Sequence, residues 1–515
     1  MVGGDWMQVA LPTEGDPQTV LETVFGYSEF RAGQREIIDA VLAGRDCIGV
    51  MPTGAGKSLT FQVPAKVLGG TVLVLSPLIS LMKDQVDGLE RLGFRAAVFN
   101  STLGEQERAQ RLREVRAGLL ELLYIAPEAL GSSLRHALSQ CPIKLIVVDE
   151  AHCISHWGHD FRPAYRKLAN LKGEFGDVPV LALTATATRR VAYDIIRQLG
   201  MRKPAGYKGS FYRPNLRILV HKKGTGRVTR NDILALIRAH RGDSGIVYCA
   251  TRKGVDQLTE WLLKQGIKAL PYHAGLDDAT RTEHQDYFAR DEIQVIVATV
   301  AFGMGIDKSN VRFVVHREMP RSIEAWYQEI GRAGRDGLQS DIVTFYSWKD
   351  VVDYDGFLTD IQDPDQRAET RMRTKALFNL LDRPGCRHQA LVGYFDEAIE
   401  RCGGSCDQCL GIDISSLLTK QAPRLDTTIR LGKPSWVTSA DAEPDADLFE
   451  RLRTLRRQIA DAEGVPAYIV FSDAVLRDMA RRVPKSEGEL LRVSGIGPHK
   501  AQRYGARFLE VLRDA

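Results

Sequence analysis

Two short segments of the 515-residue chain combine residue types that suit phosphate chemistry. In Met51-Pro-Thr-Gly-Ala-Gly-Lys-Ser58, glycines let backbone N–H groups approach phosphate oxygens, Lys57 suits the β- and γ-phosphates, and Ser58 suits magnesium. About ninety residues later, an apolar run ends in Asp149 and Glu150. Asp149 is a candidate magnesium ligand, and Glu150 a candidate for polarising attacking water. Together the segments predict hydrolysis of a nucleoside triphosphate.

A glycine-rich segment of the second half could supply positive charge to that reaction. It reads Trp326-Tyr-Gln-Glu-Ile-Gly-Arg-Ala-Gly-Arg-Asp-Gly337, so Arg332 and Arg335 are three residues apart and share one face if helical. Phosphoryl transfer builds charge that an arginine from a neighbouring lobe stabilises when a cleft closes. Two arginines on a helix are usually just solvated. Their glycine-rich setting and position in the chain favour the functional interpretation.

An aromatic-rich segment directly follows the acid pair, and it contains Trp157, His159, Phe161 and Arg162. Aromatic faces beside a cation suit unpaired bases, because stacking contributes about 1–3 kcal/mol per base in any sequence. A buried aromatic cluster is the alternative interpretation. A zinc site from His152, His156 and His159 is a poorer one, because no cysteine pair supports it.

The eight cysteines are distributed unevenly. Four are scattered through the first half and are expected to be small buried hydrophobes: Cys47, Cys141, Cys153 and Cys249. The other four are Cys386, Cys402, Cys406 and Cys409, and the spacing of the last pair is typical of tetrahedral zinc. With four protein ligands no position is left for water. We therefore expect one structural zinc ion, whose removal unfolds the segment.

Short apolar runs alternate with helical patterns between about residues 25 and 346. We expect buried strands at 46–51, 71–75, 122–125, 145–148, 180–183, 245–249, 294–298 and 312–315. Helices such as 81–92 and 256–264 lie between them. This alternation indicates βαβ units and parallel sheets. The span is too long for one sheet, so we expect two α/β lobes with a hinge at 207–215.

Composition excludes several classes of protein. Hydrophobic residues make up 44% and charged residues 26%, near the globular average, which excludes wholesale disorder. No run of eighteen apolar residues exists, and residues 1–17 carry no lysine or arginine, so neither a membrane span nor a secretory signal is expected. The net charge of +4 is compatible with nucleic acid binding but does not establish it. The cysteine pattern favours a reducing compartment.

Several motifs together resemble those of superfamily 2 helicases, and of their RecQ branch in particular. The resemblance rests on Asp-Glu-Ala-His at 149–152, on the phosphate loop and on a third segment. That segment, Phe25-Gly-Tyr-Ser-Glu-Phe-Arg-Ala-Gly-Gln34, resembles the adenine-recognition motif. The resemblance implies that Tyr27 stacks on adenine and that Gln34 reads its edge, with Arg31 nearby. The implied ATP cradle consists of Thr53, Gly54, Gly56, Lys57 and Ser58.

The resemblance also implies roles for the remaining motifs. Segments 76–85 and 124–128 resemble family motifs that lie on the strand-binding face. Segment 183–188 resembles the motif that couples hydrolysis to movement, and segment 151–162 resembles the aromatic-rich loop. In the second lobe it implies Arg335 as the arginine finger, Arg332 as a γ-phosphate contact, and Asp307 and Gln328 as coupling residues. The cysteine cluster resembles the RecQ zinc subdomain, although the gap at 403–405 is one residue longer than usual.

The last part of the chain, 447–515, resembles the small helical HRDC domain. Gly495 and Gly497 form a turn between helical patterns, beside Lys500 and Arg503. This turn is either a phosphate-binding surface or a plain helix connection. The linker between the zinc subdomain and this domain comprises only residues 411–446. A RecQ protein usually has a winged-helix domain of about a hundred residues at this place, and the linker is too short to contain one. We therefore expect that domain to be absent and the unwinding of long duplexes to be modest.

The expected fold class is α/β: two RecA-like parallel-sheet lobes, then a helical zinc-binding subdomain and a small all-α C-terminal domain. The expected units are an N-terminal extension 1–17, an ATP-binding lobe 18–208, a second lobe 209–347, a zinc subdomain 348–410, a linker 411–446 and an HRDC-like domain 447–515.

The resemblance implies an ATP-dependent 3′-to-5′ DNA helicase of repair, recombination and replication, using ATP, Mg²⁺ and one structural Zn²⁺. Expected partners are single-stranded and tailed or forked duplex DNA, a single-strand-binding protein or other repair proteins, and no membrane. The expected compartment is the cytoplasm with its nucleoid in a bacterium, or the nucleus in a eukaryote. An RNA helicase is the rival enzyme, disfavoured by the aromatic loop and zinc module. A nucleotide-switched annealing scaffold is disfavoured by Lys57, Glu150 and Arg335.

Overall fold

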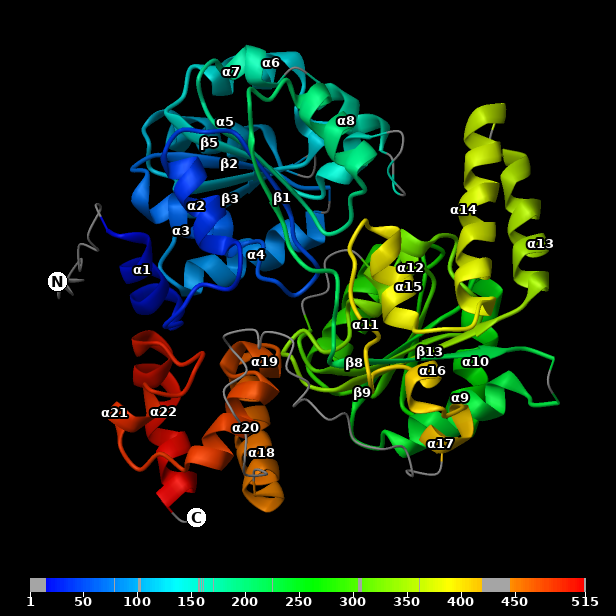
Figure 1. The fold of residues 1–515 in the computed structure, drawn as a ribbon. Coiled ribbons are helices and arrows are strands. Elements are labelled where there is room, and N and C mark those ends of the chain that lie inside the picture. Colours follow the sequence, from blue (N-terminus) through cyan, green and yellow to red (C-terminus); the bar gives the residue numbers. More distant parts are fainter. Residues whose placement is uncertain are drawn as a thin grey trace.

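The computed structural model describes residues 15–513 except 78, 101–102, 156–157, 159, 161, 170, 225, 304–307, 361 and 419–444. Two α/β lobes follow one another along the chain, then a group of helices bearing the cysteine cluster, and finally a bundle of helices (Figure 1). Among the described residues, no helix is both long and apolar enough to cross a membrane. All eight cysteines are described, and each is a free thiol.

The first lobe, blue to cyan in Figure 1, is built on a seven-stranded parallel sheet of order β3-β4-β2-β5-β6-β1-β7. Its strands are β1 (Cys47–Val50), β2 (Thr71–Leu75), β3 (Ala96–Phe99), β4 (Leu122–Ile125), β5 (Ile143–Val148), β6 (Val180–Thr184) and β7 (Ala205–Lys208). Both faces of the sheet are covered, which is why the central strands are apolar along nearly their whole length.

Helices α2 (Gln34–Leu42), α3 (Leu59–Val67) and α4 (Ile79–Arg91) cover one face of this sheet. The other face is covered by α6 (Ser132–Ser139), α7 (Leu171–Phe175) and α8 (Arg189–Leu199). The other helical segments of the lobe are α1 (Pro17–Val20), η1 (Leu21–Phe25), α5 (Glu105–Arg116), η2 (Pro127–Ala129), η3 (Ala151–Ile154) and η4 (Pro163–Leu168).

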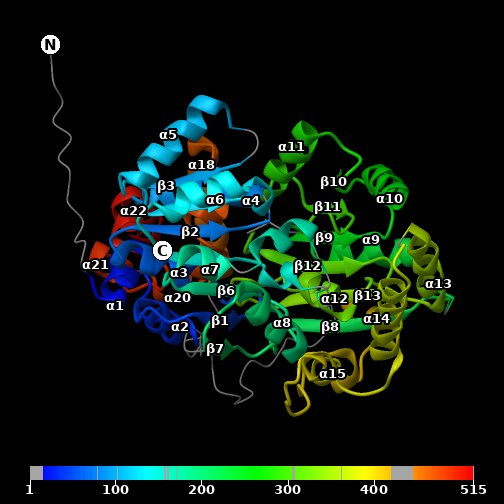
Figure 2. The same cartoon turned by 90° about the horizontal axis from the view of Figure 1, so that it is seen from above.

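The second lobe, in green, has a six-stranded parallel sheet of order β10-β11-β9-β12-β13-β8. Its strands are β8 (Leu216–Lys222), β9 (Ser244–Tyr248), β10 (Ala269–Tyr272), β11 (Val295–Ala298), β12 (Val311–His316) and β13 (Ser340–Tyr346). Helices α9 (Thr229–Ala239) and α10 (Arg252–Lys264) pack on one face, and α11 (Asp278–Ala289) and α12 (Ile323–Ile330) on the other. Figure 2 shows the two lobes side by side.

The eight strands predicted from apolar runs are all present, but five others were missed. Strand β7 reads Ala-Gly-Tyr-Lys and lies at the sheet edge, so it lacks the apolar run of a central strand. Strand β13 buries Ser340 and Asp341, which hides its core position from a hydrophobicity pattern. The hinge is also shorter than predicted. Tyr207 and Lys208 belong to β7, and residues 209–215 connect the lobes.

The cysteine-bearing helices follow β13 directly. They are α13 (Trp348–Phe357), η5 (Leu358–Asp360), α14 (Pro364–Asp382), α15 (Arg387–Tyr394), α16 (Asp407–Leu410) and α17 (Ile414–Leu418). Helices α13 and α14 lie side by side and extend away from the sheet (Figure 1). Helix α17 buries Ile414 and Leu417 in the core of the second lobe.

The C-terminal bundle has a core of its own. Its helices are α18 (Ala446–Glu463), α19 (Ala467–Val470), α20 (Asp473–Arg482), α21 (Glu487–Leu490) and α22 (Pro498–Arg513). The bundle contacts both lobes. An added Cβ atom on Gly26 would lie 2.2 Å from the backbone nitrogen of Gly497, and Arg453 donates a hydrogen bond of 2.9 Å to the carbonyl oxygen of Gly242.

Candidate active site

The phosphate loop connects β1 to α3, with Gly54 and Gly56 at φ angles of +82° and +79°. Glycine adopts such angles without the steric penalty that other residues incur. Met51 stands where the simplest phosphate-loop pattern has its first glycine, and its side chain is fully buried in the core. The substitution therefore leaves the phosphate-facing backbone unobstructed. Lys57 folds back so that its Nζ atom lies 3.5 Å from the carbonyl oxygen of Met51.

The predicted adenine-recognition residues lie directly against this loop. Gln34 is 1% exposed, and its Nε2 atom donates hydrogen bonds to the carbonyl oxygens of Ala55, at 3.2 Å, and Gly56, at 2.9 Å. Its Oε1 atom accepts a hydrogen bond of 2.8 Å from the backbone N–H of Arg31. Arg31 in turn donates from Nη1 to the carbonyl oxygen of Gly54. To read an adenine edge, the Gln34 amide would have to exchange these partners.

The acid pair follows the carboxyl end of β5, a central strand of the sheet, close enough to the phosphate loop for the charge of Lys57 to act on Asp149. Burial and the neighbouring Glu150 carboxylate raise the pKa of Asp149 to about 7, whereas Lys57 lowers it. Glu150 has a φ of +46°, a left-handed backbone conformation that costs a non-glycine residue about 1–3 kcal/mol. Its Oε2 atom is buried and accepts no hydrogen bond from the described residues. Backbone strain and a buried carboxylate oxygen that accepts no hydrogen bond, although His152 Nδ1 lies 3.4 Å away, together indicate a functional position.

A chain of polar contacts leads from the acid pair to the second lobe. The Nδ1 atom of His152 lies 3.0 Å from the hydroxyl of Thr184, which donates a hydrogen bond to the carbonyl oxygen of Thr186. Gln328 of α12 donates from Nε2 to the hydroxyl of Thr186 at 3.4 Å. The structure thus places Gln328, a predicted coupling residue, against Thr186 of the segment 183–188. Asp307, the other predicted coupling residue, lies outside the described residues.

Arg332 and Arg335 follow α12 directly. A Cβ atom added to Gly54 would lie 3.6 Å from Cα and Cγ of Arg335, so the predicted finger lies beside the phosphate loop. Arg332 is buried, and a Cβ atom on Gly303 would approach its Nη2 atom to 2.8 Å. Arg335 is about 280 residues from the phosphate loop in the sequence, and the fold places the two side by side.

Three of the four predicted base-contacting residues of the aromatic-rich loop, Trp157, His159 and Phe161, lie outside the described residues. Arg162 is described. Its Nε atom donates to Asp160 at 3.1 Å and its Nη1 atom to the carbonyl oxygen of Pro77 at 3.1 Å. Arg162 therefore ties this loop to the segment after β2. Arg373 of α14 contacts the same loop by donating a hydrogen bond of 3.1 Å to the carbonyl oxygen of Gly158.

A second group of metal-binding residue types lies beside the acid pair. The ligand atoms of His152, Cys153 and Asp160 lie within 4.8 Å of one another. Burial, and then the Asp160 and Glu150 carboxylates, raise the pKa of the Cys153 thiol well above its ordinary value. The group offers three ligands, one fewer than the closed set of four that a structural zinc site has. His156 and His159 of the alternative histidine site lie outside the described residues.

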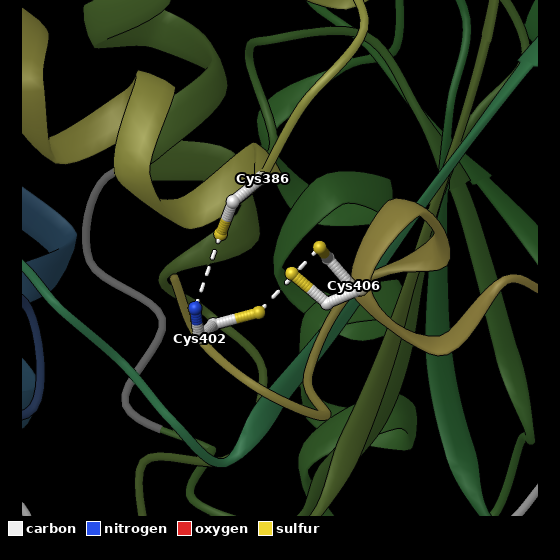
Figure 3. Close-up of side chains that lie close together, drawn as sticks. Cys386, Cys402 and Cys406 are labelled. Atoms are coloured by element: carbon white, nitrogen blue, oxygen red, sulfur yellow. Dashed lines mark hydrogen bonds between the residues drawn. The ribbon is translucent and has the colours of Figure 1, made fainter. Parts of the chain in front are cut away.

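The four clustered cysteines converge as the sequence predicts. Their sulfur atoms lie within 4.8 Å of one another, compatible with the separation of about 3.8 Å that tetrahedral zinc with Zn–S bonds of about 2.3 Å requires. Cys386 is the N-cap residue of α15, and its sulfur accepts a hydrogen bond of 3.2 Å from the backbone N–H of Cys402 (Figure 3). The Cys402 thiol in turn lies 3.5 Å from the sulfur of Cys406. The Arg387–Asp407 ion pair, at 2.9 Å, fixes the two arms of the cluster. The residues present fit a structural zinc ion.

The glycine turn of the C-terminal bundle is already occupied by protein contacts. Gly497 packs on Gly26, next to Tyr27, and is buried. Lys500 donates to the carbonyl oxygen of Ile469 at 2.8 Å, and Arg503 pairs with Glu463 at 2.9 Å. In this arrangement the turn is a docking surface for the first lobe. A phosphate could reach it only after the bundle moved away.

Sequence reasoning missed Arg213, which lies in the hinge between the two lobes. It donates hydrogen bonds to the carbonyl oxygens of Thr53 in the phosphate loop and of Ala333 and Gly334 between the two arginines. Backbone carbonyl acceptors leave no signature in a sequence, so only the glycine and basic composition of the hinge marked this segment.

Comparison with families of known proteins matches most of the chain. A DEAD/DEAH box helicase family matches residues 31–195, and the helicase conserved C-terminal domain matches 229–337. The RecQ zinc-binding family matches 348–410, and the HRDC domain matches 445–512. The order of these regions is the order of the lobes, the cysteine-bearing helices and the bundle in the structure.

Whole-chain relatives agree with these regions. The ATP-dependent DNA helicase RecQ of Pasteurella multocida is 37% identical over 599 aligned positions, which cover 98% of this chain and 94% of that protein. The protein of the same name from Bacillus subtilis is 35% identical and covers 96% of this chain and 98% of its own length.

Solved structures share the arrangement of the lobes. Dbp5 of S. cerevisiae, bound to RNA and ADP BeF3, has a TM-score of 0.52 at 16% identity, covering 68% of this chain and 94% of that one. The DUF1998 helicase MrfA bound to DNA has a TM-score of 0.54 at 19% identity, covering 65% and 52%. At such identities the likeness concerns the fold alone.

Two parallel-sheet lobes, a phosphate loop and acid pair in the first, and Arg335 of the second lobe beside that loop define a helicase-type nucleoside triphosphatase. Within that class, the whole-chain relatives and the zinc-binding and HRDC regions indicate one family. The chain belongs to the RecQ family of ATP-dependent DNA helicases.

Proposed function

We propose that this RecQ-family enzyme uses ATP hydrolysis to move 3′ to 5′ along single-stranded DNA and to unwind tailed or forked duplexes. Repair, recombination and replication are the processes that expose such DNA. The observation that carries the proposal is the position of Arg335 beside Gly54, because it makes catalysis depend on closure of the two lobes. Closure that alternates with hydrolysis is what a motor requires.

Each proposed catalytic residue has a task that its position supports. The phosphate loop and Lys57 bind the phosphates, Glu150 accepts a proton from the attacking water, and Arg335 and Arg332 stabilise charge on the transferred group. Ser58 and Asp149 offer hydroxyl and carboxylate oxygens, which are the donors that Mg²⁺ prefers. The raised pKa of Asp149, caused first by burial and then by Glu150, supports a cation site between the acids and the loop. Bound there, Mg²⁺ would neutralise phosphate charge.

The polar chain from Glu150 through His152 and Thr184 toward Gln328 is the proposed coupling route. It joins the water-activating residue of one lobe to a helix of the other. The aromatic-rich loop is joined to the same region, because η3 follows Glu150 directly and leads into the loop. We propose that a base stacked on this loop shifts His152 and thereby aligns Glu150.

The proposed setting follows from the proposed substrate. Single strands in a cell are coated by single-strand-binding protein and attended by other repair proteins, so these are the proposed protein partners. The proposed compartment is the bacterial cytoplasm at the nucleoid. Neither proposal depends on the geometry of the ATP site.

The deciding experiment measures ATP hydrolysis with no nucleic acid, with single-stranded DNA and with single-stranded RNA, and then unwinding of 3′-tailed, 5′-tailed, forked and blunt DNA. We expect strong stimulation by DNA, weak stimulation by RNA, and unwinding of 3′-tailed and forked substrates. Preferential unwinding of 5′-tailed DNA would contradict the polarity. Equal stimulation by RNA would contradict the substrate class.

A further inference from the structure

Arg213 joins the phosphate loop to the turn that bears the arginine finger. It lies in the connection between β7 of the first lobe and β8 of the second. Its Nη1 atom donates a hydrogen bond of 3.0 Å to the carbonyl oxygen of Thr53. Its Nη2 atom donates to the carbonyl oxygens of Ala333, at 3.0 Å, and Gly334, at 2.8 Å. One guanidinium thus spans two catalytic segments that are far apart in sequence.

The charge of Arg213 is held by neutral acceptors. Its Nε atom donates to the side-chain oxygen of Asn215 at 3.2 Å, so every acceptor named here is uncharged. Burial lowers the pKa of the guanidinium, and the like charges of Arg335 and Arg31 act in the same direction, while Tyr327 and Asp336 oppose them. Withdrawing a charge from water costs free energy unless the charged group is hydrogen-bonded. The planar guanidinium offsets this cost by donating several hydrogen bonds at once.

The turn between Arg332 and Arg335 is fixed from the hinge. Ala333 and Gly334 are the two residues between these arginines, and both of their carbonyl oxygens accept from Arg213. Asn215 adds hydrogen bonds of 3.0 Å from Nδ2 to the carbonyl oxygens of Gly334 and Leu338. Gly334 has a φ of +57°, and a Cβ atom there would lie 2.5 Å from Asn215 Nδ2, so the turn accepts only glycine in this packing.

The approach of this turn to the phosphate loop is equally close. A Cβ atom on Gly331 would lie 2.0 Å from the hydroxyl oxygen of Thr53, the residue whose carbonyl oxygen accepts from Arg213. The bond to Thr53 reaches the first lobe, whereas the bonds to Ala333 and Gly334 reach the second. Lobe opening must therefore break at least one side of this bridge, and closure restores both sides together.

We propose that Arg213 is a positioning residue for ATP hydrolysis, which places Arg335 against the phosphate loop when the lobes close. It acts through the backbone of Ala333 and Gly334 and is not itself required to contact the nucleotide. Asn215 supports it by holding the same turn. This inference rests on the proposed role of Arg335 as the arginine finger.

The test is a double-mutant cycle in the full chain with ATP hydrolysis as the readout. Arg213→Lys keeps the positive charge but loses the planar set of donors that bonds three carbonyl oxygens at once. It should lower kcat by about tenfold to a hundredfold, which is the usual cost of a misplaced catalytic group. The KM for ATP should change by less than about twofold. In an Arg335→Ala background the same substitution should lower kcat by less than about twofold, because its effect passes through Arg335.

Two controls separate positioning from general damage. Arg217→Lys alters a buried arginine of β8, which pairs with Asp341 at 2.7 Å in the second lobe, and should leave kcat within about twofold of wild type. Asn215→Ala removes the support of Gly334 without removing the Arg213 charge, and should lower kcat and lose that effect in the Arg335→Ala background. It serves as the decisive variant if Arg213→Lys does not fold.

A binding readout completes the design. The Arg213→Lys variant should bind a fluorescent ADP like wild type but should bind ADP with aluminium fluoride, a mimic of the transferred group, at least about tenfold more weakly. Equal losses of kcat in the wild-type and Arg335→Ala backgrounds would overturn the proposal. A normal kcat in Arg335→Ala alone would instead show that the proposed finger is wrong, and that result is seen before the cycle is completed.

Discussion

The Nδ1 atom of His152 lies 3.4 Å from Oε2 of Glu150, so an imidazole borders the carboxylate proposed to activate water. The two residues are held together by the turn after β5, in which Glu150 adopts a left-handed backbone conformation. Because His152 also contacts Thr184 at the end of β6, any movement of that strand end reaches the carboxylate. We propose that hydrolysis is linked to the arrangement of the lobes at this pair.

Glu150→Gln should bind ATP normally and lose hydrolysis by about a hundredfold to ten-thousandfold, the usual contribution of a general base. An amide keeps the size of the side chain but cannot accept the proton. Nucleotide affinity and turnover are measured on the same preparation. Asp177→Asn, a change at a fully exposed carboxylate of the first lobe, is the control and should behave like wild type. Turnover close to normal in Glu150→Gln would remove the assigned role.

Trp157→Ala should spare ATP binding and reduce the stimulation of ATP hydrolysis by single-stranded DNA. The prediction is made from sequence, because Trp157 lies outside the described residues. A stacked base contributes about 1–3 kcal/mol, so the concentration of DNA needed for half-maximal stimulation should rise at least severalfold. The matched control is Tyr193→Ala, at an aromatic side chain of α8 that is 74% exposed. Stimulation that survives intact would favour core packing of the loop.

Cys406→Ser should abolish zinc binding and unfold the cysteine-bearing helices. Cys406 pairs with Ile218 of β8 in an isolated bridge, so the cluster anchors this region to the second lobe. A structural zinc site contributes its binding free energy directly to folding. Metal analysis should find about one zinc ion per wild-type chain and none in the variant. Cys141→Ser, at a thiol remote from the cluster, should retain the metal; zinc retained by Cys406→Ser would contradict the ligand set.

Removal of residues 445–515 should raise KM for ATP by about threefold or more. The bundle packs on Gly26, beside Tyr27, and its loss frees a turn that must be ordered again for adenine to stack. Gly497→Val tests the same contact in the full chain, because even a Cβ atom there would lie 2.8 Å from Cα of Gly26. Gly488→Ala, at an open position in α21, is the matched control. An unchanged KM in both altered proteins would show that docking does not affect the nucleotide.

The sequence predicted those parts of the site that depend on residue type, and it missed those that depend on backbone approach. Lys57, Glu150 and the cysteine cluster were found because their chemistry restricts both residue type and spacing. The role of Arg213 depends on carbonyl oxygens, which every residue possesses. The contact between Gly26 and Gly497 joins segments about 470 residues apart, and nothing in either glycine indicates its partner. Such contacts are set by tertiary packing alone.

The stretch between the zinc-binding and HRDC regions is too short for the winged-helix domain of about a hundred residues that the RecQ resemblance leads us to expect. The zinc-binding region ends at 410 and the HRDC region begins at 445. The alignment with the P. multocida helicase has 599 positions, whereas this chain has 515 residues. At least 84 residues of that relative therefore have no counterpart in this chain.

Without that domain, contacts to the duplex ahead of a fork must come from the cysteine-bearing helices or the C-terminal bundle. Phosphate contacts determine affinity and its dependence on salt, so binding to duplex DNA should be weakened more than binding to single strands. We therefore expect strong DNA-stimulated ATP hydrolysis together with unwinding that falls steeply as the duplex lengthens. The measurement compares 3′-tailed duplexes of increasing length and a blunt duplex, with ATP hydrolysis followed in the same reactions. A continued high rate of hydrolysis on the long substrates would show that the motor still runs while strand separation fails. Efficient unwinding of long blunt duplexes would mean that another surface of this chain replaces the missing domain.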